Sequence, residues 1–285
     1  MGEPVRVRAP AKINWTLEVV GRRPDGYHEV CTVLQTIGLW DELTILPASS
    51  LTVRCQGPFA VEDELVARAV RALDPQARVE VIIHKAIPPA SGLGGGSADA
   101  AAALRAICRL RGWHLPQERL MEVAASLGSD VPFFLLGGTA LARGRGEQLS
   151  PLADAPQVWL VLVVPPLRVS DKTARMYRLL TPASYSDGTF TQRFLERLWE
   201  TQRVDENYMY NAFESVSYSL FPEIARYRAA LLEAGARRVH LAGSGPALFA
   251  LASGREEAQA LAARVKAPGA HVIVTCTVGR REALG

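Results

Sequence analysis

The amino-acid sequence predicts an α+β protein made of two domains. Strand-like runs rich in β-branched residues dominate its N-terminal part, and helical patterns follow them. A strand-like run at 79–83 leads through a glycine-rich turn into an alanine-rich segment, 98–111, with the composition of a helix. The C-terminal part has the order strand, loop, strand, helix, strand, which is typical of a sheet with helices on one face.

The N-terminal part begins with predicted strands that Gly, Pro and Asp turns separate. The expected strands span residues 5–8, 13–20, 30–37 and 43–46, with a shorter one at 51–55. Residues 62–73 come next, and Leu65, Ala69 and Leu73 recur there at helical spacing. We therefore expect a helix before the strand at 79–83.

Two further helices are predicted before the middle of the chain. Gly112 stands where it would end the alanine-rich helix in a left-handed cap, and Pro116 stands in the first turn of a helix at 116–127. A change of character with several prolines, around 149–157, predicts a domain boundary. We expect an N-terminal domain of residues 1–155 and a C-terminal domain of residues 156–285.

The C-terminal domain opens with an apolar run, 158–164, that predicts a buried strand. Helical patterns then recur at 171–180, 189–203, 208–219 and 222–234. Strands are expected at 238–241, 247–251 and 271–277, with a helix at 256–265 before the last of them.

Composition bears on the class of protein and its partners. Hydrophobic residues make up 48% of the chain and charged residues 21%, which are ordinary values for a globular protein. The net charge of +3 is too small to indicate a nucleic-acid partner, and the longest apolar run is too short to span a bilayer. The N-terminus has no apolar signal region, and the four cysteines form no C-x-x-C pair. We expect a cytoplasmic protein, monomer or homodimer, without nucleic-acid or membrane partners.

The glycine-rich turn predicts a phosphate-binding loop. Glycines allow backbone N–H groups to approach a ligand, and a helix N-terminus adds unpaired donors and a partial positive charge. A Walker loop is excluded because no Gly-Lys-Ser/Thr occurs here, and the dinucleotide fingerprint is excluded because Ser97 replaces its third glycine. A flexible linker is disfavoured by the strand and helix on either side. The residues expected to hold nucleotide phosphates are Pro88, Pro89, Ala90, Ser91, Gly92, Leu93, Gly94, Gly95, Gly96, Ser97 and Ala98.

Phosphoryl transfer also needs a cation and a group that aligns or deprotonates the attacking hydroxyl. Asp130, in a turn of small polar residues before Pro132, is either that base or a helix or turn cap. Lys12, at the start of a strand, is either a solvated surface lysine or a cation that stabilises such a carboxylate and the transferring phosphate.

Other candidate binding residues also have a structural alternative to a role in ligand binding. Tyr27 and His28 follow a tight turn and present an aromatic face beside an imidazole, which suits either a flat heterocycle or a packed turn. Lys85 lies close enough to the loop to reach a phosphate, or it extends to solvent. The segment 243–245 (Gly-Ser-Gly) is either a second backbone nest near a phosphate or an ordinary hairpin turn.

Three blocks together resemble the motifs of the GHMP small-molecule kinases. They are segment 10–14 (Pro-Ala-Lys-Ile-Asn) with 23–29 (Arg-Pro-Asp-Gly-Tyr-His-Glu), segment 92–101 (Gly-Leu-Gly-Gly-Gly-Ser-Ala-Asp-Ala-Ala) and segment 241–245 (Leu-Ala-Gly-Ser-Gly). The Asp-Gly-Tyr-His block, segment 128–134 (Gly-Ser-Asp-Val-Pro-Phe-Phe) and segment 144–147 (Gly-Arg-Gly-Glu) are similar to the branch whose acceptor is 4-(cytidine 5'-diphospho)-2-C-methyl-D-erythritol, CDP-methylerythritol. The likeness runs nearly end to end.

The resemblance implies a fold and an activity. The fold is an N-terminal domain like domain 2 of ribosomal protein S5 and a ferredoxin-like C-terminal domain, with the active site between them. The activity is ATP-dependent phosphorylation of the 2-hydroxyl of CDP-methylerythritol, in the non-mevalonate route to isoprenoid precursors, with Mg²⁺ as cofactor. No protein side chain is assigned to the metal, with the Ser97 hydroxyl as a candidate.

The resemblance also implies roles for individual residues. Lys12 and Asp130 are expected to be catalytic. Lys85 and the loop from Pro88 to Ala98 are expected to bind ATP. The residues expected to bind the acceptor are Asn14, Tyr27, His28, Thr173, Tyr177, Gly243 and Ser244, with Tyr177 stacked on cytosine.

Two positions depart from the resemblance. Glu64 stands where the family usually has an Asn that helps to read adenine, and a carboxylate accepts hydrogen bonds but cannot donate one to a ring nitrogen. Trp15 replaces a smaller aliphatic residue, and because it alternates with Asn14 it should face away from the substrate. The alternative functions are a sibling kinase acting on homoserine, mevalonate or a sugar, and a non-catalytic nucleotide-binding regulator on the same fold.

Overall fold

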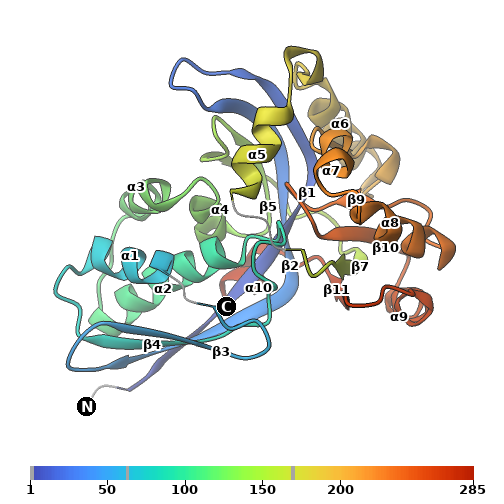
Figure 1. The fold of residues 1–285 in the computed structure, drawn as a ribbon. Coiled ribbons are helices and arrows are strands. Elements are labelled where there is room, and N and C mark those ends of the chain that lie inside the picture. Colours follow the sequence, from blue (N-terminus) through green and yellow to red (C-terminus); the bar gives the residue numbers. More distant parts are fainter. Residues whose placement is uncertain (1–2, 62–63, 168–170) are drawn as a thin grey trace.

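A long antiparallel hairpin runs through the molecule and belongs to both of its halves (Figure 1). It is formed by β1 (Val5–Arg22) and β2 (His28–Pro47) in the computed structural model, which describes residues 3–61, 64–167 and 171–285. The sequence predicted four separate strands here, and that division is wrong. Pro10 does not end β1, because the register of the ladder shifts between Pro10 and Ala11 and so accommodates the missing donor.

The hairpin lies in the middle of the first sheet. The order is β3 (Thr52–Gln56), β4 (Val79–His84), β2, β1 and β8 (Tyr210–Asn211), and β2 also pairs with β5 (Thr139–Arg143), which pairs with β6 (Gln148–Pro151). The helices of this half are α1 (Glu64–Leu73), α2 (Gly95–Arg111), α3 (Gln117–Leu127) and α4 (Val131–Leu136). They pack on one face of the sheet and enclose a core with it (Figure 1).

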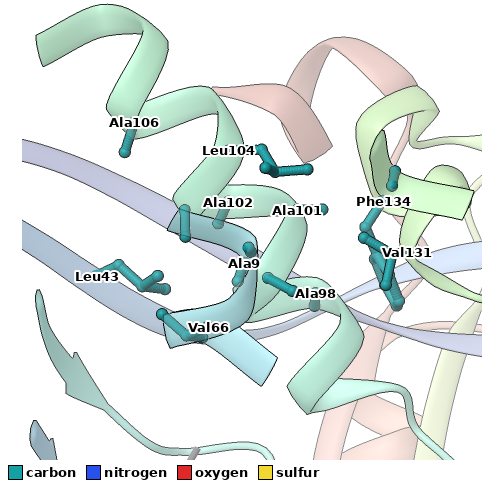
Figure 2. Close-up of a cluster of buried hydrophobic side chains, with 14 of the residues drawn as sticks. Ala9, Leu43, Val66, Ala98, Ala101, Ala102, Leu104, Ala106, Val131 and Phe134 are labelled. Carbon is teal, nitrogen blue, oxygen red and sulfur yellow. The ribbon is translucent and has the colours of Figure 1, made fainter. Parts of the chain in front are cut away.

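The alanines of α2 allow this helix to lie deep in the core. Ala98, Ala101, Ala102 and Ala106 are all buried, and Figure 2 shows them on the helix surfaces that meet the strands and α4. Alanine has the best intrinsic helix propensity, and its small side chain permits close packing. The helix ends at Gly112, whose φ of 65° gives the left-handed cap that the sequence predicted.

The second sheet has the order β11 (His271–Cys276), β7 (Trp159–Val164), β10 (Leu248–Ala252) and β9 (His240–Leu241). Side chains of β7 alternate between two cores, with Val161 and Val163 in one and Leu160 and Leu162 in the other. Both faces of the sheet are therefore covered, which explains the continuous apolar run of β7. The helices of this half are α5 (Lys172–Leu179), α6 (Thr189–Thr201), α7 (Glu214–Leu220), α8 (Ile224–Glu233) and α9 (Arg255–Arg264), whereas the last helix, α10 (Arg280–Leu284), packs against β1, β2 and α4 of the first half.

The two halves are joined by a core built on Trp15. Its ring stacks on Phe194 of α6, with centroids 6.4 Å apart, and meets Phe249 of β10 edge-on at 6.3 Å. Asn14 lines a cavity instead, so the expectation that Trp15 faces away from the substrate side is confirmed. The domain boundary at residue 155 stays a prediction. β7 opens the second sheet soon after it, whereas β8 returns to pair with β1.

Most other expected elements are present, with small shifts of their ends. The helix expected at 208–219 is wrong in its first half, where a 3-10 turn (Glu206–Tyr208) and β8 precede α7. The first two residues of the helix expected at 62–73 lie outside the described residues. α4 and α10 were not expected as helices. In the described part of the chain, no helix has the length and apolar character needed to cross a membrane.

Candidate active site

The glycine-rich loop connects β4 to α2 and packs directly against the second half of the molecule. Gly92 has a φ of 93°, and a Cβ there would collide with the carbonyl oxygen of Ala242. Gly94 has a φ of 80°, and a Cβ there would lie 2.7 Å from the Phe134 ring and 3.1 Å from Lys12 Cγ. Glycine is needed at both positions because the backbone is left-handed and its neighbours leave no space.

The loop delivers backbone donors to the start of α2. The Ala98 N–H donates to the Gly94 carbonyl at 2.9 Å and is the first in the helix with an intrahelical acceptor of this kind. The N–H groups of Gly95, Gly96 and Ser97 precede it and lie at the positive end of the helix dipole. These three residues line a cavity of about 820 Å³ together with Gly92 and Gly94. The arrangement suits an anion such as a nucleotide phosphate.

Lys12 lies on the hairpin beneath this loop. Its backbone N–H donates to the Leu93 carbonyl at 2.9 Å, so β1 and the loop are tied together at this residue. Its ammonium donates to Asn14 Oδ1 at 2.9 Å and lies 3.7 Å from Asp130 Oδ2. The Lys12 side chain is only 7% exposed. The solvated surface lysine that the sequence left open is thereby excluded.

Asp130 immediately precedes α4 and has a half-exposed side chain, with 42% of its surface accessible. Its carboxylate makes no capping hydrogen bond to the helix. The capping alternative is therefore wrong, and the carboxylate faces the cavity with Lys12 beside it. An ionised carboxylate next to a buried ammonium is suited to accept a proton from a bound hydroxyl.

Asn14 and Thr32 hold the Lys12 ammonium in place. Asn14 Nδ2 donates to Thr32 Oγ1 at 2.7 Å, and the Thr32 hydroxyl donates to the Thr16 carbonyl. Asn14 therefore presents its amide oxygen to Lys12 because its amide nitrogen is fixed by the opposite strand. Asn14 and Thr32 both line the cavity, so a substrate hydroxyl can reach them.

Lys85 lines the same cavity but is held by internal carboxylates. Its ammonium lies 2.6 Å from Asp41 Oδ2 and forms an ion pair with Asp99 of α2. Asp41 Oδ1 also accepts hydrogen bonds from the backbone of Ala86 and Ile87. Burial lowers the Lys85 pKa, but Asp99 and Asp41 outweigh it and raise the pKa above its usual value. The lysine thus fixes α2 and the start of the loop against β2, and direct contact with ATP stays a prediction.

Aromatic side chains line a second cavity, of about 930 Å³, at the end of the hairpin where a turn joins β1 to β2. The His28 ring stacks on Tyr177 of α5 with centroids 4.8 Å apart, and Tyr185 meets His28 edge-on. Tyr27 is 56% exposed, and the Arg145 guanidinium lies 4.9 Å from its ring centroid. Burial, and secondarily the charge of Arg22, lower the His28 pKa, which favours the neutral imidazole.

The segment 243–245 is the turn between β9 and β10, as one of its two interpretations stated. Gly243 and Ser244 also line the first cavity, and Ser244 Oγ lies 3.2 Å from Thr173 Oγ1 of α5. Asn211 Nδ2 donates to the Gly243 carbonyl at 2.8 Å and fixes the turn. The segment 243–245 is therefore a hairpin turn that also forms part of the cavity wall.

The two cavities meet at Asp130. Both are lined by Ser97, Asp130, Arg145, Thr173, Ala174 and Tyr177. A nucleotide on the glycine loop and a second molecule among the aromatic rings would therefore approach each other at the Asp130 carboxylate. Glu64 lines the first cavity on the α1 side, which is consistent with a position near a base, although its role in reading adenine stays a prediction.

Several residues that line the cavities were not singled out from the sequence, among them Thr32, Arg145 and Lys172. Thr32 carries no motif, and only strand pairing brings it to Asn14. Arg145 belongs to a segment that entered only through the resemblance, and Lys172 lies next to the expected Thr173. Local sequence offered no sign that the ammonium of Lys172 turns inward.

Comparison with known proteins places the chain in a family. Residues 64–138 match the profile "GHMP kinases N terminal domain", and residues 195–271 match "GHMP kinases C terminal". A mevalonate kinase from L. major in complex with R-mevalonate superposes with a TM-score of 0.71 at 18% identity, covering 98% of this chain and 99% of that one. The fold and the loop-centred site thus define a kinase of the GHMP class.

Closer relatives specify the branch. A 4-diphosphocytidyl-2-C-methyl-D-erythritol kinase of Dehalococcoides mccartyi is 41% identical over 95% of this chain and 97% of its own length. One of Pelotomaculum thermopropionicum is 43% identical over 96% and 98%. A crystal structure of 4-(cytidine 5'-diphospho)-2C-methyl-D-erythritol kinase superposes with a TM-score of 0.79 at 38% identity, over 96% of this chain and all of that one. The chain belongs to the 4-diphosphocytidyl-2-C-methyl-D-erythritol kinase family of the GHMP kinases, an ATP-dependent small-molecule kinase family.

Proposed function

We propose that this chain transfers the γ-phosphoryl group of ATP to the 2-hydroxyl of CDP-methylerythritol, giving the 2-phosphate and ADP. The single observation that carries the proposal is the position of the Lys12–Asp130 pair, where the loop-lined cavity meets the aromatic one. The curated relatives supply the acceptor through their names.

ATP is expected to occupy the first cavity. The backbone N–H groups at the start of α2 would bind the phosphates, and Ser97 would place its hydroxyl near the terminal one. Binding by main-chain groups positions the γ-phosphoryl group without adding a nucleophile, as phosphoryl transfer requires.

The acceptor is expected in the second cavity, with its hydroxyl toward Asp130. Asp130 accepts or orients the hydroxyl proton as the oxygen attacks the γ-phosphorus, and the bond from phosphorus to the bridging oxygen of ADP breaks. Lys12 stabilises the carboxylate and the negative charge on the moving phosphoryl group from the buried side. Asn14 and Thr32 keep the ammonium in that position.

Mg²⁺ would supply further charge neutralisation on the ATP phosphates. The described residues contain no group of three or more His, Cys, Asp or Glu side chains placed to hold a metal ion. A site without such a cluster suits a cation that is held mostly by phosphates and water, as Mg²⁺ is at many nucleotide sites. Ser97 is the protein hydroxyl proposed to contribute a ligand.

The aromatic rings favour a cytidylyl acceptor over the small acceptors of sibling kinases. His28, Tyr177, Tyr185 and Tyr27 offer flat surfaces and polar edges that homoserine or mevalonate would not use. The presence of both Lys12 and Asp130 argues against a regulator that binds the nucleotide without turnover.

The deciding experiment is a coupled ADP-release assay with purified protein, ATP and Mg²⁺. CDP-methylerythritol, homoserine, mevalonate and galactose are offered in turn, and the product of the first is checked by ³¹P NMR for a 2-phosphate. Turnover with CDP-methylerythritol alone is expected. Faster turnover with any of the others, or ATP binding without turnover on all four, would overturn the proposal.

A further inference from the structure

The first turn of α5 places a buried lysine between two loops from different halves of the molecule. Lys172 Nζ donates to the Ala90 carbonyl of the glycine loop at 3.0 Å and to the Gly245 carbonyl of the β9–β10 turn. Its side chain is buried and lines the first cavity. In Figure 1, α5 lies between the helices of the two halves.

The two loops already touch through backbone contacts. The Ala247 N–H donates to the Ser91 carbonyl at 3.0 Å, and the glycine loop passes so close to Ala242 that Gly92 has no space for a Cβ. Ala90 has a left-handed φ of 55°, which is strained for a residue with a side chain. The Lys172 ammonium binds the carbonyl of this strained residue, and so stabilises the loop where its backbone alone favours another conformation.

Lys172 forms no ion pair with any of the residues that the structure describes, and both of its hydrogen-bond acceptors are neutral carbonyl groups. An ammonium has three N–H donors, and these two carbonyls use two of them. The third remains for the cavity that the side chain lines.

We infer that Lys172 is a positioning residue for the nucleotide: it fixes the glycine loop against the β9–β10 turn, and the phosphate groups of the bound nucleotide complete its hydrogen bonding. The inference rests on the proposed ATP site and adds to it a residue whose protonation is coupled to nucleotide binding.

The charges around the lysine support this coupling. Burial, and secondarily the positive charge of Lys12, lower the Lys172 pKa to about 7. The other charged side chains lining the cavity are the acidic Glu64, Asp130 and Asp171 and the basic Lys12, Lys85 and Arg145. Bound phosphate oxygens add negative charge beside the ammonium and favour its protonated form. At a pH above 7, nucleotide binding should therefore take up a proton.

The test measures binding rather than turnover. The non-hydrolysable analogue AMP-PNP is titrated with Mg²⁺ into the protein by calorimetry at pH 6 and pH 8, each in two buffers of different ionisation enthalpy. At pH 8, binding to the wild type should take up about one proton beyond those that the analogue and the other protein groups exchange. A pKa near 7 leaves the Lys172 amine of the unliganded protein mostly neutral at this pH.

Three variants identify the group responsible. Lys172→Met should lose that uptake and bind the analogue about tenfold or more weakly, because charge-assisted hydrogen bonds are lost. Lys172→Arg, which stays charged, should keep most of the affinity yet show no uptake. Lys266→Met removes an exposed lysine outside the cavity and should behave as the wild type. Melting temperatures check that each variant is folded.

The outcomes separate the two proposals. If the wild type does not bind AMP-PNP, the proposed ATP site itself fails. If it binds, but Lys172→Met retains both affinity and proton uptake, Lys172 has no positioning role. A Lys172→Met variant with a lower melting temperature but wild-type affinity and proton uptake would show that the lysine is purely structural. If Lys172→Met fails to fold, absence of uptake in the wild type at pH 8 overturns the inference by itself.

Discussion

The Lys12 ammonium lies 3.7 Å from the Asp130 carboxylate, and the two side chains differ sharply in exposure, at 7% and 42%. The lysine is fixed from behind by Asn14, whereas the aspartate faces the space that both cavities share. This asymmetry assigns different parts to the two residues. The carboxylate is placed to meet the acceptor hydroxyl, and the ammonium is placed to stabilise charge without leaving its site.

Asp130→Asn should lower kcat by about 100- to 10,000-fold, the range for loss of a positioned proton acceptor. Lys12→Met should lower kcat by about 100- to 1,000-fold, the range for loss of a group that stabilises charge in the transition state. Neither change should weaken acceptor binding much, since the aromatic rings are untouched. The measurement is steady-state kinetics with calorimetry of CDP-methylerythritol binding. Glu118→Gln, which neutralises an exposed carboxylate of α3, is the control. Wild-type turnover in either variant would refute the assignment.

Tyr177→Ala should raise KM for the cytidylyl acceptor much more than KM for ATP. Stacking of an aromatic ring on a base contributes about 1–3 kcal/mol, or roughly 5- to 150-fold in affinity. Tyr177→Phe keeps the ring and serves as the matched control. In the structure Tyr177 stacks on His28, so cytosine must use another face or separate the two rings. Equal effects on both substrates would argue against stacking.

Gly94→Ala tests the close approach of the loop, with Gly112→Ala as its matched control. Both glycines have a positive φ, of 80° and 65°, so both changes carry backbone strain of about 1 kcal/mol or more. Only at Gly94 does a Cβ also meet Phe134 and Lys12, whereas Gly112 has open space. We expect Gly94→Ala to weaken ATP binding strongly, and Gly112→Ala to lower stability alone. Similar ATP affinity in the two variants would contradict the assigned loop geometry.

Asp99→Asn should destabilise the fold by about 1.5–3 kcal/mol, because it weakens one of the two charged contacts of a buried lysine that Asp41 still pairs. Asp74→Asn, at the more exposed ion pair with Arg111, should cost about 1 kcal/mol or less. Urea unfolding with unchanged m-values measures both. A smaller loss for Asp99→Asn than for Asp74→Asn would show that the buried ion pairs do not hold α2.

The Lys85 ion pairs should contribute equally to stability across neutral pH. The folded-state pKa of Lys85 is raised above its unfolded value, so its contribution is fully present below the unfolded pKa of about 10.4 and is lost only as pH rises through the folded one. The difference in unfolding free energy between wild type and Lys85→Met should thus not fall between pH 6 and pH 8. A decline between these pH values would contradict the raised pKa.

Interactions between residues that are neighbours in the chain determine most of the helices and strands and the position of the glycine-rich loop. Gly112 ends its helix as expected, and the glycine-rich turn lies between a strand and the alanine-rich α2. The motifs also pointed to Lys12 and Asp130, and Trp15 faces away from Asn14 because strand alternation is a local rule.

Only the tertiary structure decided which side chains meet. The sequence around Pro10 predicted a break between two strands, but β1 continues through it and the ladder with β2 shifts its register there. The carboxylates that hold Lys85, those of Asp41 and Asp99, come from other elements, and Lys172 turns inward to two distant carbonyls. Propensity and turn chemistry act between neighbours in sequence. The partner of a buried charge is set by packing between distant segments, for which no local pattern exists.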